Sequence, residues 1–70
     1  MNQSFAVVIE EADQNFSAYV PDLPGCVATA ATRDAVLAEI RAAIAFHLDG
    51  LAADKQPQPP LRSSVAIVQV

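Results

Sequence analysis

The spacing of apolar residues changes once along the chain, from alternation to a three-and-four repeat. In residues 4–10 the side chains of one face are bulky and apolar, which predicts a β-strand. The polar residues 11–15 predict a hairpin loop, and residues 16–20 repeat the alternation on a second strand. A third strand is predicted from Cys26 to about Ala31. The inner rows of the first two strands would consist of Phe5, Val7, Ile9, Phe16, Ala18 and Val20.

Beyond Thr32 the apolar positions fall at intervals of three and four, which is the spacing of a helix that lies on a sheet. Thr32 is suited to the N-cap position, and Asp34 is suited to the first turn. We therefore expect a helix from about Arg33 to Leu51 or Ala53. Its buried stripe would consist of Leu37, Ile40, Ile44, Leu48 and Leu51.

The remaining residues predict an extended connection and a final strand. Residues 56–60 contain three prolines, which lack backbone donors. Residues 63–70 are apolar on both faces and predict a strand. The sequence thus predicts a single α+β domain over residues 1–70 with the order β-β-β-α-β. Its one sheet would be largely antiparallel, with the single helix packed on one face.

Two proline turns separate the second and third strands. Pro21 ends the second strand because proline removes a backbone donor. Pro24 and Gly25 are typical of a type II turn, since glycine accepts a positive φ at its second central position. Leu23, between the two prolines, is expected to close one end of the core. The structural turn would comprise Pro21, Asp22, Leu23, Pro24, Gly25 and Cys26.

Size and charge favour association with another protein. A 70-residue chain buries only about 60% of the surface that its unfolded form exposes, and one cysteine excludes a disulfide framework. The net charge of -4 disfavours nucleic-acid binding and favours a basic partner. The start of the chain lacks a cationic targeting region, and no apolar run reaches the ~20 residues that span a bilayer. We expect a cytoplasmic protein without membrane contact.

No group of residues has the pattern of a catalytic, metal or cofactor site. His47 has no acid-base partner at helical spacing, so we interpret it as a residue at the edge of the core. Cys26 has no cation near it in sequence and is expected to be an inert buried thiol. The carboxylates are dispersed, and we interpret them as solvated charges. The sequence therefore predicts a protein that is not an enzyme.

Two apolar surfaces are candidates for an interface with a partner or a second copy. Val8 and Tyr19 lie on adjacent predicted strands, on the face away from the helix. Phe46 points nearly opposite the predicted core stripe of the helix, with Ala42 beside it. Two alternatives remain: the proline linker folds over Phe46, or another subunit covers these surfaces.

The run Tyr19-Val20-Pro21-Asp22-Leu23-Pro24-Gly25-Cys26, followed by a small-residue strand and an Ala/Ile/Leu helix, resembles the HicB-like antitoxin domain. The resemblance covers residues 5–53. It implies a β-β-β-α-β fold that self-associates and masks a HicA-type toxin, a small basic ribonuclease that cleaves messenger RNA. Full-length members carry a C-terminal DNA-binding segment; this sequence lacks one, so we expect no operator binding through it.

Three hypotheses follow. The first is an antitoxin that neutralises a small basic ribonuclease by masking it. The second is an orphan homo-oligomeric scaffold or small-ligand-binding module of the same fold without a toxin partner. The third is a minimal nuclease with a ribonuclease-H-like ancestor, in which metal-dependent RNA cleavage would require Asp22 or Asp34.

Overall fold

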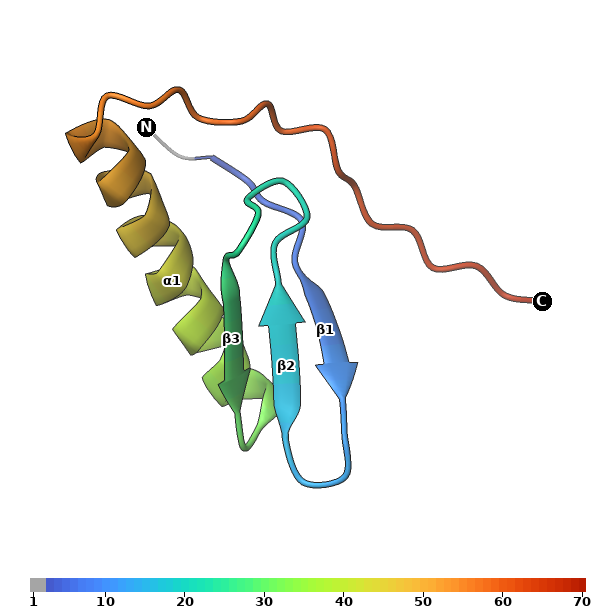
Figure 1. Cartoon of the computed structure of the whole chain (residues 1–70). Helices are drawn as coiled ribbons and strands as arrows, with labels where there is room; N and C mark the ends of the chain where they lie inside the picture. Colours follow the sequence, from blue (N-terminus) through green and yellow to red (C-terminus); the bar gives the residue numbers. More distant parts are fainter. Residues whose placement is uncertain (1–2) are drawn as a thin grey trace.

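A three-stranded sheet carries one long helix on one of its faces (Figure 1). The computed structural model describes residues 3–70, so Met1 and Asn2 of the predicted domain lie outside it. The elements are β1 (Val8–Glu11), β2 (Phe16–Tyr19), β3 (Val27–Ala30) and α1 (Arg33–Ala53). The strands are antiparallel in the order β1-β2-β3. The predicted α+β class, with three strands followed by a helix, is confirmed.

The core lies between the sheet and the side of α1 that faces it. The helix packs on β3 and β2. The largest fully buried side chains are Leu23, Val20 and Val36. Phe5, Val7 and Ile9 are half-buried against this core, which places the inner row of the first strand as predicted. The buried residues are Ala18, Val20, Leu23, Cys26, Val36 and Ile40.

The double-proline segment folds into two consecutive turns between β2 and β3. The Leu23 amide donates to the Val20 carbonyl at 3.0 Å, and the Cys26 amide donates to the Leu23 carbonyl at 3.0 Å. Gly25 adopts a φ of 82°, as the second central residue of a type II turn requires. The Val20 amide also donates to the Cys26 carbonyl at 3.1 Å and closes the segment. Leu23 is thereby held in the core with no exposed surface.

β1 begins later than residues 4–10 predict, at Val8 rather than near Ser4. Val8 lies opposite Tyr19, the last residue of β2. Beyond Tyr19 the chain turns at Pro21, which has no backbone donor, and the Val20 amide bonds to Cys26 instead. Residues 5–7 consequently have no strand to pair with, although their side chains still reach the core.

The helix has the predicted bounds and the predicted N-cap. The Thr32 hydroxyl accepts a hydrogen bond from the Ala35 amide at 3.1 Å. At the other end, the Lys55 amide donates to the Ala52 carbonyl and the Gln56 amide donates to the Leu51 carbonyl, which is a Schellman motif. Lys55 occupies the left-handed position of this motif with a φ of 56°.

The buried stripe of α1 differs from the predicted one. Val36 and Ile40 are the buried residues of the helix, and Ala43 packs beside them. Leu37, Ile44 and Leu48 are half-buried on the flank of this stripe. The helix is rotated in this way because it packs on β2 and β3 rather than across the whole sheet.

The predicted fourth strand is wrong for this structure, since residues 54–70 contain no strand. The chain leaves α1, crosses the end of the sheet at which β1 begins, and then diverges from β1 (Figure 1). A strand needs the backbone of a neighbour, and residues 63–70 lie too far from β1 to find one. The radius of gyration is 13.1 Å, against about 11 Å for a compact domain of this length. No helix among residues 3–70 is long and apolar enough to span a membrane.

Candidate interaction surfaces

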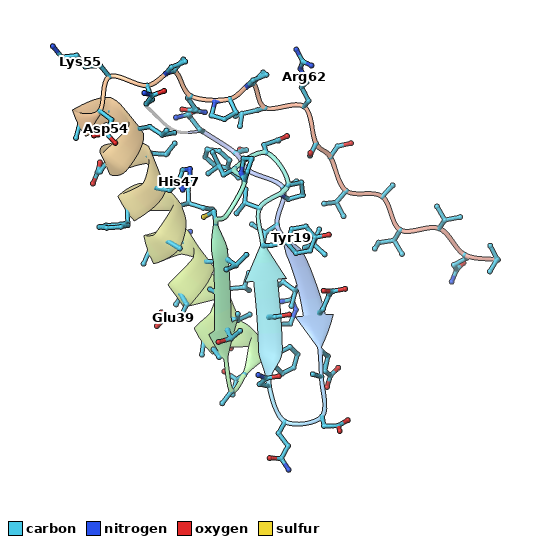
Figure 2. All side chains as sticks on the ribbon, viewed as in Figure 1. Tyr19, Glu39, His47, Asp54, Lys55 and Arg62 are labelled. Carbon is cyan, nitrogen blue, oxygen red and sulfur yellow. The ribbon has the colours of Figure 1, made fainter. Side chains whose placement is uncertain are left out.

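An apolar row crosses the sheet on the face opposite α1. The strand register sets Val8 opposite Tyr19, and Tyr19 opposite Val27. We call these three residues the outer row. Tyr19, which Figure 2 labels on the sheet, is 41% exposed. Val27 is 64% exposed. The alternation of the strands produces this row because successive side chains point to opposite faces.

The next row on the same face is polar. Glu10 lies opposite Ser17, and Ser17 lies opposite Thr29. The apolar outer row therefore has a polar boundary on the side of the β1–β2 hairpin, where Glu11 and Asp13 are also exposed. An apolar centre with a charged rim is typical of protein-binding surfaces.

The second predicted surface, Ala42 and Phe46, lies on a flank of α1. Phe46 is 81% exposed, and Ala42 is exposed one turn before it. Because the helix is rotated, Phe46 lies roughly 80° from Val36 around the helix axis, rather than directly opposite the sheet. The proline linker does not cover it; instead, Gln58 Nε2 donates to Gln3 Oε1 at 2.7 Å.

An apolar groove of about 860 Å³ lies on the other flank of α1, between the helix and residues 3–7. Leu37, Ile44 and Leu48 line it from the helix, and Phe5 and Val7 line it from the N-terminal segment. These helical side chains were predicted to lie in the core. We refer to this feature as the apolar groove.

A smaller cavity of about 420 Å³ separates β1 from the C-terminal segment. Val7, Val8 and Ile9 line one side, and Val65 and Ile67 line the other. Apolar side chains thus face each other across a gap along the outer edge of β1. Among residues 3–70, no strand pairs with this edge.

Asp22 holds the C-terminal segment at the end of the sheet. Its Oδ2 accepts from the Ser63 amide at 3.0 Å, and its Oδ1 accepts from the Ser63 hydroxyl at 2.8 Å. These bonds, led by the one from the Ser63 amide, lower the pKa of the Asp22 carboxyl. The sequence predicts Asp22 as part of the turn and indicates no partner for it. No local pattern links two residues that are 41 positions apart.

The remaining candidate residues do not converge. Cys26 is 4% exposed, and burial raises the pKa of its thiol. His47 is half-buried on the side of the helix that faces the sheet (Figure 2). Asp22 and Asp34, which a nuclease would require, lie on the turn and in the first helical turn. Within residues 3–70, no three side chains of His, Cys, Asp or Glu form a group that could hold a metal ion.

The sequence is similar to a curated phage protein and to a protein family. The relative is the "Uncharacterized 14.9 kDa protein in rep-hol intergenic region" of Haemophilus phage HP1, which is 29% identical over 55 residues. The alignment covers 79% of this chain and 41% of the phage protein, so the chain spans less than half the length of that relative. No solved structure matches the chain.

The family match extends further along the chain than the resemblance seen in the sequence. It covers residues 5–69, which include the three strands, the helix, the proline linker and nearly all of the C-terminal segment. The family is described as "HicB_like antitoxin of bacterial toxin-antitoxin system". The chain therefore belongs to the HicB-like antitoxin family.

Proposed function

We propose that this chain is an antitoxin that binds a small basic HicA-type ribonuclease and prevents it from cleaving messenger RNA by masking it. The family match over residues 5–69 carries the proposal. The surface supports it, because Tyr19 and Val27 of the outer row and Phe46 of the helix are apolar side chains exposed to solvent. On a 70-residue domain such side chains are best explained by a protein that covers them.

Charge supports a basic partner. The chain has a net charge of -4, and Glu10, Glu11 and Asp13 are exposed together around the β1–β2 hairpin. This end of the sheet borders the outer row, so a cationic ribonuclease would be drawn toward the apolar contact surface. Masking requires no chemistry from the antitoxin, and we propose that the chain is not an enzyme.

Self-association is the second part of the proposal. Among residues 3–70, six residues are buried, all of them apolar, and apolar side chains are left exposed on the sheet, the helix and the C-terminal segment. Such a small core provides little stability by itself. A dimer or larger assembly would cover part of this surface, and the toxin would cover another part.

A ribonuclease assay tests the proposal. The partner should be sought as a short basic reading frame beside the gene, and the purified chain should abolish its RNA cleavage at molar excess. Tyr19→Asp should weaken this inhibition at least tenfold, because it places a charge at the centre of the outer row. Thr29→Asp is the matched control, since Thr29 is exposed on the same face in the polar row. Continued cleavage at molar excess of the unaltered chain would refute the proposal.

The apolar groove favours a second candidate, in which the chain is a homo-oligomeric module that binds a small apolar ligand. A groove of about 860 Å³ is large enough for a small organic molecule. This function predicts that a hydrophobic fluorescent dye binds the assembled protein and that Leu48→Lys abolishes its binding. It also predicts that no ribonuclease is inhibited.

A further inference from the structure

The last seven residues of the chain form an apolar segment that its own domain does not cover. We call residues 64–70 the C-terminal arm. Val65 is 63% exposed, Ile67 is 89% exposed and Val68 is 77% exposed. In an extended strand, Val65 and Ile67 lie on one face, while Ala66, Val68 and Val70 lie on the other. A segment that is apolar on both faces is typical of a strand that is buried on both sides.

The family match shows that this arm is part of the domain, since it extends to residue 69. An exposed, β-branched segment with unpaired backbone groups is prone to pair with another strand. The arm must therefore be covered in the protein's working state.

The outer edge of β1 has the features of a receptor for this arm. Within residues 3–70 its backbone groups pair with β2 on one side alone. The apolar groove lies beside the residues that lead into β1, and Phe5 and Val7 line it. A strand added at this edge would direct one row of side chains into the groove and the other row beside the outer row.

The lengths of the two segments agree. Seven extended residues span about 23 Å. Residues 5–7 have no strand partner and lead directly into the four residues of β1, so residues 5–11 offer an edge of the same length. The arm starts from Ser63, which Asp22 fixes at the end of the sheet where β1 begins. From this point the arm diverges from its own β1 and leaves a cavity of about 420 Å³ between them (Figure 1).

Two features favour the β1 edge of a second copy over the arm's own edge. The linker contains Pro57, Pro59 and Pro60, which make it a stiff spacer that carries the arm away from its own helix. In the single chain the arm also diverges from its own β1, and within residues 3–70 no strand pairs with its backbone. Exchange of an identical element between two copies is a low-cost route to a dimer.

We propose that in a dimer the C-terminal arm of each copy pairs as a strand with the outer edge of β1 in the other copy, where its side chains fill the apolar groove. This inference rests on the self-association proposed above and is independent of the toxin.

Isotope-filtered NMR on a mixed dimer tests the exchange directly. Copies labelled with ¹³C are unfolded together with unlabelled copies, refolded, and examined without any toxin. Cross-peaks between the methyl groups of Val65 or Ile67 in one copy and those of Val7 or Ile9 in the other are expected. Cross-peaks confined to single chains would overturn the proposal, and so would the absence of any contact between the arm and β1. Either result would leave the ribonuclease assay unaffected.

A pair of charge substitutions provides an independent readout. Ile67→Lys should raise the dissociation constant of the dimer at least tenfold, because it removes an apolar side chain from the groove. Gln69→Lys adds the same charge on the same face of the arm, two residues further on, and should change that constant less than threefold. Equal effects of the two substitutions, or no effect of Ile67→Lys, would overturn the proposal. Sedimentation equilibrium measures both constants.

Discussion

Leu23→Ala tests whether the double-proline turn stabilises the domain by inserting a side chain into the core. Leu23 has no exposed surface and is the largest of the fully buried side chains. Two turns fix its backbone through the amides of Leu23 and Cys26. Because these bonds hold the segment in place, the surrounding residues cannot easily collapse into the space that the substitution leaves.

The expected loss is large for a domain of this size. Substituting a buried leucine by alanine lowers the free energy of unfolding by about 2–5 kcal/mol, and a rigid site lies toward the upper part of this range. The total free energy of unfolding for 70 residues is roughly 3.5–10 kcal/mol. Leu23→Ala should therefore remove a third or more of the stability and leave a partly unfolded population.

Urea denaturation followed by circular dichroism measures this loss. Leu61→Ala is the matched control, since Leu61 is 41% exposed and its substitution should cost less than about 0.5 kcal/mol. Both variants should be compared with the unaltered chain at several protein concentrations, so that dissociation is separated from unfolding. A loss below about 1 kcal/mol for Leu23→Ala, or an equal loss for both variants, would refute this account of the turn.

Four further predictions concern single sites. Gly25→Ala should lower the free energy of unfolding by about 1–2 kcal/mol, because alanine is strained at a φ of 82°. No atom lies within 4 Å of the added Cβ, so no clash adds to this loss, and an unchanged urea midpoint would contradict the prediction. Gly50→Ala should raise the same quantity by about 0.5–1 kcal/mol, since Gly50 is helical with open space beside it; a loss would contradict it. The pKa of Asp22 is lowered in the folded chain, so its contact with Ser63 is fully present above the ordinary carboxyl pKa of about 3.9 and is lost as the pH falls through the lower pKa of the folded state. The protection of the Ser63 amide against hydrogen exchange, taken relative to its intrinsic exchange rate at each pH, should fall over this range, and less so in Asp22→Asn. Phe46→Asp should leave the unfolding curve unchanged, because Phe46 is 81% exposed. It should reduce either the affinity for the toxin or the mass of the assembly. If both stay unchanged, the flank of α1 that carries Phe46 is not an interface.

The features that could be predicted from the sequence depend on neighbouring residues. The type II turn follows from Pro24 and Gly25, and the helix start follows from the hydroxyl of Thr32. The position of Tyr19 beside Val8 follows from alternation in two strands joined by a short hairpin. In each case a few covalently close residues determine the geometry, so a local pattern is sufficient.

The features that could not be predicted depend on tertiary packing. The spacing of apolar residues cannot distinguish a helix centred over the sheet from one displaced toward β3. The predicted buried stripe therefore lacked Val36, which is buried, and included Leu37, which lines the apolar groove. Likewise, alternation in residues 63–70 indicates a strand but does not specify its neighbour. The contact of Asp22 with Ser63 joins a turn residue to the C-terminal segment through the fold alone.

The central claim is that this chain becomes a complete structure only when another chain covers its apolar surfaces. Light scattering coupled to gel filtration tests it most directly, on the purified chain at micromolar concentration without a toxin. The account predicts a mass of at least twice the 7.4 kDa of one chain. A stable, folded species of 7.4 kDa at all concentrations would contradict it.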